Sequence, residues 1–286
     1  MRKMLCDFSD GEESVVQLSG GAMNNADRLG ILSVFLTVDG ECNNHGPGIW
    51  SVFVRTRGCT VGCRWCDTKY SWQQKGGTLL TPEELVESVT LIGHGCQKVT
   101  ITGGEPLEQD ANALGAFIRK LLDRDYTISV ETSGTYHVDK FRAAQGVQHH
   151  PDLSFIVDFK LSSAQATKND HSQYVKLRQR DCIKMVIGDR NDFLEALFVS
   201  KGIRVQNKRT PIYFSPVHGV LAPAQLLAWM REHDCQELDL RINLQLHKLI
   251  WPNDSRIEEN EGIDFTKRSL GRSGFLERAH TTDQKL

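Results

Sequence analysis

The sequence lacks the long apolar segments that carry a chain into or across a membrane. No apolar run approaches the roughly 18 to 20 residues that a membrane-spanning helix needs. The polar start, MRKMLCDFSDGEESVV, has no apolar core of the kind found in secretory signals. From these absences we expect a cytoplasmic protein without a membrane partner.

An excess of one charge is also missing. The chain has 34 Lys and Arg residues against 36 Asp and Glu residues, which gives a net charge of −2. Such a balance provides no overall attraction to nucleic acid or to an anionic membrane, so we expect no nucleic-acid partner. Repeats of a fixed period and low-complexity tracts are absent too, and the hydrophobic fraction of 40% is ordinary for a globular protein with a sizeable core.

Eight cysteines are present, but a disulfide framework is not expected. Such frameworks stabilise small secreted domains, whereas 286 residues are enough for a hydrophobic core. Cys96 and Cys182 border apolar runs and Cys235 follows an expected helix, so we interpret them as thiols. The cysteines at 59, 63 and 66 are too close together for such a framework and have the spacing of a metal site.

Short apolar strands alternate with helices from residue 31 onward. We expect strands at 31–38, 51–57, 98–104, 126–132, 153–160, 182–188, 211–217 and 237–246. We expect helices at 81–95, 111–124, 138–145, 192–202 and 223–233. Thr81 and Glu84 form a T-x-x-E capping box for the first helix, and Gly202 is expected to end the fourth.

The order of these elements predicts an α/β fold. Because the strands are apolar on both faces and are separated by helices, a parallel sheet with helical crossovers is favoured. About six such units would form a partial (β/α)6-type barrel. Residues 30–252 would make up this domain, between a polar N-terminal extension at 1–29 and a polar C-terminal tail at 253–286.

Distinctive groups follow the ends of five expected strands. They are the cysteines after residue 57, TGGEP after 101, ETSGT after 130, DFKLSS after 157 and SPVHG after 214. Ligands of parallel α/β folds gather at the carboxyl ends of the strands. The sequence therefore predicts one site built from these five segments.

The cysteine loop follows the pattern C-x3-C-x2-C and supplies three thiolates. Thiolates are soft ligands that suit an iron–sulfur cluster or zinc. Zinc would need a fourth ligand, for which Cys42 or His45 is available. A cubane cluster held by three cysteines instead leaves one iron open to a substrate or cofactor. Three unrelated thiols are the third interpretation.

Two of these segments together resemble the radical S-adenosylmethionine superfamily. They are the cysteine loop, with Trp65 before its last cysteine, and TGGEP at 102–106. CDTKYSW, VTITGGEPLEQ, VETSGT, DFKLSS and LQLHKLIWP more closely resemble the 7-carboxy-7-deazaguanine synthase family, over about residues 32–252. The resemblance implies the partial barrel of that superfamily, with a 4Fe–4S cluster, S-adenosylmethionine and Mg²⁺ as cofactors.

The resemblance also implies where these cofactors bind. Cys59, Cys63 and Cys66 would hold the cluster, whose electron cleaves S-adenosylmethionine to a radical inside a shielded cavity. Expected contacts to S-adenosylmethionine are Trp65, Gly103, Gly104, Glu105, Lys160, Ser162, Ser215, Pro216, Val217 and His218. Thr68 would ligate Mg²⁺, oriented by Asp67; the alternative for this pair is a turn cap. The alternative for Trp65 is core packing.

The implied substrate is 6-carboxy-5,6,7,8-tetrahydropterin, which loses ammonia as its ring contracts to 7-carboxy-7-deazaguanine. Expected substrate contacts are Val38, Asp39, Gly40, Glu41, Arg55, Thr102 and His247. A carboxylate at Glu41 suits the N–H donors of a pterin, and a cation at Arg55 suits its carboxylate. The alternative for Arg55 is a solvated strand edge. An electron donor such as flavodoxin or ferredoxin and a homodimer are further expectations from the resemblance.

Three departures from the family pattern concern the substrate site. Where the pattern is Q-G-E-G, this chain has Asp39, Gly40, Glu41 and Cys42, so an amide becomes a carboxylate and a glycine becomes a thiol. About 34 residues also follow Pro252, where some family members end. Two other functions stay open: a radical-generating activase that acts on a partner protein, and a zinc-stabilised binding module without catalysis.

Overall fold

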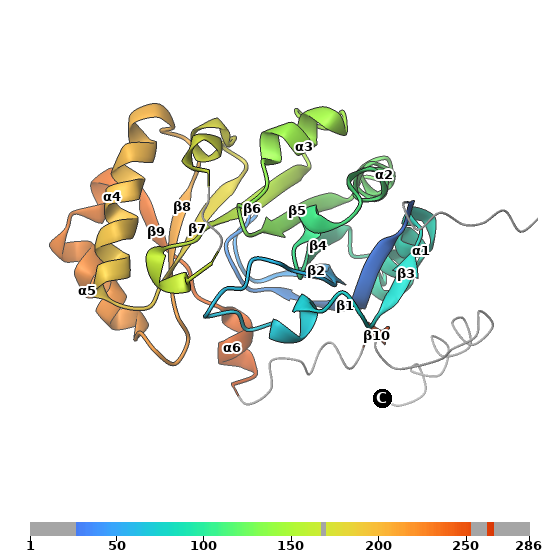
Figure 1. Ribbon diagram of the computed structural model, residues 1–286, viewed down its shortest axis with the longest axis horizontal. Coiled ribbons are helices and arrows are strands. Elements are labelled where there is room, and N and C mark those ends of the chain that lie inside the picture. Colours follow the sequence, from blue (N-terminus) through green and yellow to red (C-terminus); the bar gives the residue numbers. More distant parts are fainter. Residues whose placement is uncertain (1–26, 167–169, 253–261, 266–286) are drawn as a thin grey trace, which may run out of the picture.

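The computed structural model describes residues 27–166, 170–252 and 262–265, which form one curved sheet with helices around it (Figure 1). The strands are β1 (Leu29–Asp39), β2 (Ile49–Thr56), β3 (Thr78–Leu80), β4 (Lys98–Gly103), β5 (Thr127–Thr132), β6 (Leu153–Phe159), β7 (Cys182–Ile187), β8 (Ile212–Pro216), β9 (Leu240–Ile242) and β10 (Ile263–Asp264). The helices are α1 (Pro82–Gly93), α2 (Ala111–Leu122), α3 (Val138–Ala144), α4 (Arg190–Gln206), α5 (Pro223–Glu232) and α6 (Leu246–Ile250).

The strands lie in the order β10-β1-β2-β4-β5-β6-β7-β8-β9, and β3 pairs with the end of β1. From β2 to β9 all neighbours are parallel, whereas β1 is antiparallel to β2. Parallel neighbours require crossover connections, and α1 to α5 lie in these connections. The predicted partial barrel of parallel strands with helical crossovers is confirmed.

The strands are largely apolar on one face and largely polar on the other, so the expectation of two apolar faces is wrong. Val99 and Ile101 of β4 belong to the buried core, as do Ile183 and Met185 of β7. The core also contains the apolar side chains of α1, α2, α4 and α5. Because successive strand side chains point to opposite faces, the residues between these core positions lie on the other face of the sheet.

That other face is largely polar. It carries Lys98, Thr100 and Thr102 from β4, Ser129 and Glu131 from β5, Ser154 and Asp158 from β6, Lys184 from β7, and Ser215 from β8. Strands of a fully covered parallel sheet would be apolar on both sides. The alternation therefore indicates a sheet with two different faces. One face packs against the helices to form the core, and the other face lines a polar site.

The helix ends agree with their sequence signals in one case and differ in another. Thr81 and Glu84 form the predicted capping box, with each side chain accepting the backbone N–H of the other residue. Gly202 does not end α4, which continues to Gln206. Gly202 has no unusual φ and open space around it, so the helix passes through it without strain.

The last predicted strand, 237–246, is also wrong in extent. Cys235–Leu238 forms a short 3-10 helix, only Leu240–Ile242 pairs with β8, and α6 follows. The apolar residues of this segment alternate across a turn, a strand and a helix. The change matters for function because it places His247 on α6.

The two predicted terminal segments are described only in part. The extension at 1–29 lies outside the described residues up to residue 26, and Leu29 already belongs to β1. Of the tail at 253–286, only residues 262–265 are described, and β10 pairs there with Ser33 and Val34 of β1. Among the residues described, no helix is both long and apolar enough to cross a membrane.

Candidate active site

The polar face of the sheet borders a cavity of about 390 Å³. It reaches from the carboxyl ends of the parallel strands, where the cysteine loop lies, to the end of β1. The predicted residues that line it are Val38, Asp39, Gly40, Glu41, Arg55, Cys59, Cys63, Trp65, Cys66, Thr68, Thr102, Gly103, Gly104, Lys160, Ser215, Pro216, Val217, His218 and His247. Residues that are distant in the chain therefore line one cavity, as predicted from the segments that follow the strand ends.

The cysteine loop after β2 presents three thiols to this cavity. Trp72 donates its indole N–H to Cys66 Sγ at 3.2 Å, and the Thr68 hydroxyl lies 3.5 Å from the same sulfur. Burial raises the pKa of the Cys59 thiol to about 11 and also raises the pKa of Cys63. Binding of a soft metal centre would displace the protons of these thiols.

Neither proposed fourth ligand for zinc lies with the cysteine loop. Cys42 is 2% exposed and packs against Ile156 and Cys182. His45 lies in the loop between β1 and β2, where burial lowers its pKa and nearby Lys98 adds to the effect. The four-ligand zinc site therefore has no support.

The TGGEP segment packs directly on the start of the cysteine loop, and glycine is required there. Gly103 has a φ of +121°, which other residues rarely adopt. A Cβ on Gly104 would lie 2.0 Å from the carbonyl oxygen of Gly58. The next residue, Glu105, donates its backbone N–H to that same oxygen at 2.8 Å. The two glycines thus let the loops after β2 and β4 touch.

Glu105 and Ser162 are the two predicted residues that do not line the cavity. The Glu105 side chain is 1% exposed and accepts the Thr132 hydroxyl and the Ser133 N–H at 2.7 Å each. It ties the loop after β4 to the end of β5. Ser162 is exposed, and its backbone N–H donates to Glu195 of α4.

The other predicted contacts to S-adenosylmethionine come from the loop after β2, from Lys160 directly after β6, and from the end of β8 with the residues that follow it. Trp65 donates its indole N–H to Ser163 at 3.3 Å, and its ring lies against Gly188, where an added Cβ would meet it at 3.2 Å. Ser215, the first residue of the segment 215–218, accepts the Asn243 amide at 3.1 Å. Trp65 thus combines packing, its alternative interpretation, with a place in the cavity wall.

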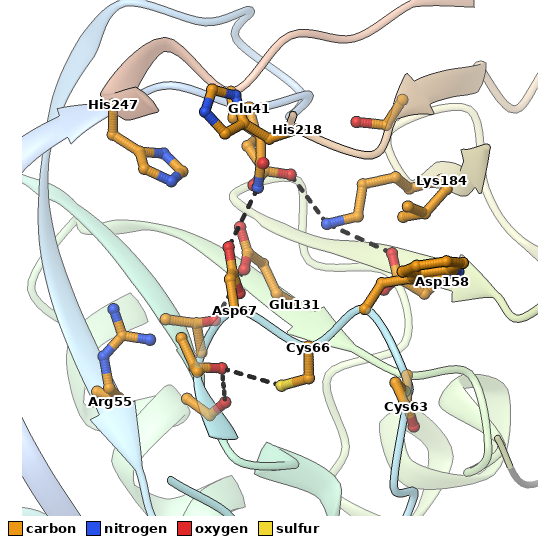
Figure 2. A pocket seen from close by; sticks show the side chains of 18 of the residues that line it. Glu41, Arg55, Cys63, Cys66, Asp67, Glu131, Asp158, Lys184, His218 and His247 are labelled. Carbon is orange, nitrogen blue, oxygen red and sulfur yellow. Dashed lines mark hydrogen bonds and ion pairs between the residues drawn. The ribbon is translucent and has the colours of Figure 1, made fainter. Parts of the chain in front are cut away.

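Lys184 of β7 joins two carboxylates across the cavity, as Figure 2 shows. Its Nζ lies 2.9 Å from Glu41 Oε2 and 3.4 Å from Asp158 Oδ1, and Asp158 also pairs with Lys160. Burial opposes the charge of Lys184, but the carboxylates outweigh it and raise the pKa well above its usual value. Burial likewise opposes the charge of Glu41, but Lys184 and the Gln245 amide outweigh it and lower the pKa.

Asp67 connects the cysteine loop to α6. Lys248 Nζ lies 3.6 Å from Asp67 Oδ2, and the Gln245 amide donates to the same oxygen at 3.4 Å. Burial raises the pKa of Asp67, but Lys248, Arg55 and His247 outweigh it and leave the pKa lowered. A charged Asp67 therefore holds α6, and with it His247, close to the third cysteine.

Arg55 is held inside the cavity rather than at a solvated edge. Its guanidinium lies 5.6 Å from the centre of the Phe35 ring and 5.8 Å from that of Tyr70. Arg55 and Thr102 are neighbours because β2 and β4 pair at this register. Burial lowers the pKa of His247 on the same cavity wall, with Glu41 opposing this effect and Lys248 adding to it. These positions suit the recognition of an anionic group.

Glu131 at the end of β5 is a protonatable carboxyl in the cavity wall. Its Oε2 accepts the Thr102 hydroxyl at 2.7 Å. Burial raises the pKa of Glu131 to about 7, with Glu41 and Asp39 adding to the effect and Lys184 opposing it. Glu131 can therefore hold or release a proton near neutral pH, which a solvated glutamate does not do.

The carboxylate of Asp39, predicted as a substrate contact, already has a partner in the protein. Asp39 Oδ2 lies 3.1 Å from Lys98 Nζ and accepts the Thr100 hydroxyl at 2.9 Å. The two charged side chains are only 2% and 7% exposed, and Lys98 also donates to Ser129 at 2.8 Å. The change from amide to carboxylate is thus neutralised within the sheet, although Asp39 still borders the cavity.

Glu131, Asp158 and Lys184 line the cavity but were not singled out from the sequence. They lie in TISVET, LSFIVDF and CIKMVI. In these strands, apolar residues on the face covered by helices alternate with residues on the face that borders the cavity. A charged residue at such an alternate position shares a face with its polar neighbours in adjacent strands. That alternation is the signal that identifies them.

Comparison with known proteins agrees with this geometry. The model of the Radical SAM superfamily matches residues 53–154, which contain the cysteine loop and TGGEP. The chain is 33% identical over 233 residues to the 7-carboxy-7-deazaguanine synthase of Chlorobaculum tepidum, covering 80% of this chain and 96% of the relative. It is 30% identical over 229 residues to the 7-carboxy-7-deazaguanine synthase of Clostridium acetobutylicum, covering 79% and 97%.

A solved structure extends the likeness to the fold. QueE from Escherichia coli matches with a TM-score of 0.58 and 22% identity, covering 79% of this chain and 99% of that chain. The fold and the cysteine loop define a radical S-adenosylmethionine protein. More particularly, the identity to relatives covered almost in full shows that the chain belongs to the 7-carboxy-7-deazaguanine synthase family.

The cavity wall fits the cofactors that this superfamily implies, a 4Fe–4S cluster and S-adenosylmethionine. Three thiols come from one loop that faces the cavity. Gly103 and Gly104 expose backbone beside that loop, at a place that side chains would otherwise fill. Both features are independent of the family comparison.

The buried Asp39–Lys98 pair predicts a large stability difference. Lys98→Met leaves the Asp39 carboxylate buried without its cation, and we expect a loss of about 3 kcal/mol in the free energy of unfolding. The double variant Asp39→Asn/Lys98→Met removes both charges and should recover much of the loss. Urea denaturation of the three proteins measures both effects.

Lys120→Met is the matched control, because Lys120 pairs with Glu83 where the two side chains are 39% and 61% exposed. Its cost should stay below about 1 kcal/mol. Equal stability of Lys98→Met and the unchanged protein would contradict the assigned pair.

The raised pKa of Glu131 predicts a pH-dependent effect of Glu131→Gln. Folded Glu131 keeps a proton that the unfolded chain releases, so the unchanged protein loses stability as the pH rises from about 4.5 to 7. Gln does not titrate, so the variant should be more stable than the unchanged protein at pH 8, by about 1 to 2 kcal/mol. The difference should largely vanish at pH 5.

Thermal unfolding of the ligand-free proteins at both pH values measures this difference. Glu87→Gln, at an exposed position of α1, is the control and should show no change with pH. A Glu131→Gln variant that is less stable than the unchanged protein at pH 8 would refute the buried, protonatable carboxyl.

Proposed function

We propose that the protein converts 6-carboxy-5,6,7,8-tetrahydropterin to 7-carboxy-7-deazaguanine with release of ammonia. The observation that carries the proposal is a single cavity bordered by the cysteine loop and by Glu41, Arg55 and His247. A carboxylate for pterin N–H donors and cations for a substrate carboxylate thus lie beside a loop suited to a redox cluster. The names of the two relatives described above support the same reaction.

The cofactors would occupy the side of the cavity at the cysteine loop. Cys59, Cys63 and Cys66 would hold the 4Fe–4S cluster, and the backbone of residues 103–104 with the segment 215–218 would bind S-adenosylmethionine. When bound, the two cofactors supply a one-electron reduction that leads to removal of a hydrogen atom from the substrate. The cavity wall would shield this chemistry from other reactive groups.

The chain's own residues would bind and orient the pterin. Both oxygens of Glu41 are engaged, with Lys184 at 2.9 Å and the Gln245 amide at 2.8 Å. A pterin N–H donor can take the place of the amide, because the ion pair alone holds the carboxylate. Arg55, fixed between two rings, would meet the substrate carboxylate. Glu131 would hold or accept a proton next to Thr102.

Thr68 is the proposed protein ligand of Mg²⁺. Its hydroxyl lies 3.5 Å from both Cys66 Sγ and the Gly103 carbonyl oxygen, so these two contacts bind it weakly. Magnesium prefers oxygen ligands and keeps several waters, so one hydroxyl together with substrate oxygens suffices. The charged carboxylate of Asp67, the preceding residue, adds favourable electrostatics.

The proposal extends to the setting of the enzyme. We expect a cytoplasmic homodimer that receives its electron from a flavodoxin or a ferredoxin, as the family resemblance implies. No specific observation favours the activase or the zinc-stabilised binding module. The cavity wall is built from charged and polar side chains suited to a small polar molecule.

The reaction itself is the first test. The protein is reconstituted with iron and sulfide without oxygen, and then incubated with S-adenosylmethionine, a reductant, Mg²⁺ and 6-carboxytetrahydropterin. Mass spectrometry should find 7-carboxy-7-deazaguanine and 5′-deoxyadenosine. Formation of 5′-deoxyadenosine alone would sustain the radical chemistry and exclude this substrate.

Arg55→Gln tests the substrate site in the same assay. Because the variant loses a charged contact to the substrate carboxylate, KM should rise at least about tenfold. Cluster content should not change. Arg124→Gln, at an exposed position after α2, is the control. An unaltered KM in Arg55→Gln would remove Arg55 from the substrate site.

Thr68 is tested through the magnesium requirement. Thr68→Ala removes the hydroxyl, so the Mg²⁺ concentration for half-maximal rate should rise about tenfold. Thr68→Ser keeps the hydroxyl and should stay close to the unchanged protein. Iron analysis and the visible spectrum of each variant show whether the neighbouring Cys66 still holds its cluster. The same Mg²⁺ dependence in all three proteins would eliminate Thr68 as the ligand.

A further inference from the structure

A second pocket lies at the opposite ends of the strands from the cysteine loop. Its volume is about 660 Å³, and it is formed by the segments that precede β6, β7 and β8, by β9 and by the loop between β1 and β2. These segments meet at the amino ends of the parallel strands. The active-site cavity shares no residue with this pocket.

The charge of this pocket is one-sided. Four of its lining residues are arginines, Arg178, Arg180, Arg209 and Arg241, and two are the histidines His149 and His150. No carboxylate is among the residues that line it. In a chain with a net charge of −2, such a concentration of guanidinium groups needs an explanation.

Two of the arginines are fixed by the protein. Arg178 donates to the carbonyl oxygens of Gln148 at 3.0 Å and His150 at 3.2 Å. Arg241 forms two hydrogen bonds to the Asp239 carboxylate, at 3.2 and 3.1 Å. These contacts hold the guanidinium planes in place, which reduces the entropy that a ligand would otherwise lose on binding.

The other two arginines carry uncompensated charge. Arg180 and Arg209 are exposed, and neither side chain forms a hydrogen bond or ion pair with another residue in the part of the chain that the structure describes. Nearby carboxylates do not cancel them. Asp239 is engaged by Arg241, and Asp181 is shared between Arg142 and Arg178. Asp152 is exposed next to the pocket, but this one carboxylate does not balance both Arg180 and Arg209. An excess of positive charge therefore remains.

We propose that this pocket binds an oligophosphate, meaning a ligand with at least two linked phosphate groups. Guanidinium groups bind phosphate oxygens in pairs of parallel hydrogen bonds, and a ligand with at least two phosphate groups matches the two free guanidinium groups of Arg180 and Arg209, beside the fixed Arg178 and Arg241. A cavity of about 660 Å³ has room for more than one phosphate. The inference does not depend on the reaction proposed for the other cavity.

The position of the pocket argues against an acidic electron-donor protein as its occupant. Such a donor has to approach the cysteine loop, which lies at the carboxyl ends of the strands. The pocket lies at their amino ends, across the length of the barrel. A single hollow also differs from the extended basic stripe that tracks a nucleic-acid backbone. A small anion is the occupant that fits both observations.

Calorimetric titration of the full-length, cluster-reconstituted protein tests the proposal, with tripolyphosphate as the first probe. We expect saturable binding at least tenfold tighter than that of inorganic phosphate. Arg180→Gln/Arg209→Gln should weaken tripolyphosphate binding at least tenfold, because two charge-assisted contacts are lost. The rate of product formation should not change in this variant.

Arg124→Gln/Arg231→Gln is the matched control, since it removes the same charge at exposed positions outside the pocket. Its affinity should stay within twofold of the unchanged protein. ATP and GTP as further probes distinguish the sources: tighter binding than tripolyphosphate indicates a nucleotide, and weaker binding indicates a free polyphosphate. No saturable binding, equal affinity for inorganic phosphate, or equal losses in both double variants would overturn the proposal.

Discussion

The ion pairs of Lys184 hold the polar cavity together. Lys184 comes from β7, Asp158 from β6 and Glu41 from the loop after β1, so one ammonium joins three separate parts of the chain. Removing these charges from water costs several kcal/mol each, which only close pairing offsets. The pairing of β6 with β7 places Asp158 and Lys184 at the same register. The sheet therefore determines where Glu41 is held.

A second lysine on the same face of the sheet holds another carboxylate from the end of β1. Asp39 at the end of β1 pairs with Lys98 at the start of β4, and Glu41 two residues later pairs with Lys184. The end of β1 is thus fixed to the polar face at two points. Gly40 lies between them with its backbone at the cavity wall, where an added Cβ would meet Leu246 at 2.9 Å. The carboxylate at position 39 therefore anchors the loop after β1 to the sheet.

The order of elements and the cysteine loop follow from local patterns, so the sequence predicts them. Caps, apolar runs and the spacing of Cys59, Cys63 and Cys66 all lie within a few residues. The partner of Asp39 is not local, because Lys98 comes from another strand and only the sheet brings the two together. Alternation of polar and apolar residues with a period of two indicates the two faces of each strand. The high apolar content of the strands obscures this alternation. The prediction of one strand at 237–246 is wrong because the alternating apolar residues of this segment belong to a 3-10 helix, a strand and the approach to α6.

Net charge describes this protein less well than the distribution of charge along its strands. In the cavity that holds the cysteine loop, Glu41, Asp67, Glu131 and Asp158 are balanced by Arg55, Lys160, Lys184 and Lys248, so its lining mixes both signs. At the amino ends, the lining of the second pocket carries four arginines and no carboxylate. A chain total of −2 conceals this difference. Since screening limits electrostatic attraction to about 10 Å at ordinary ionic strength, an anion approaching the amino ends responds to the arginines there and not to the chain total.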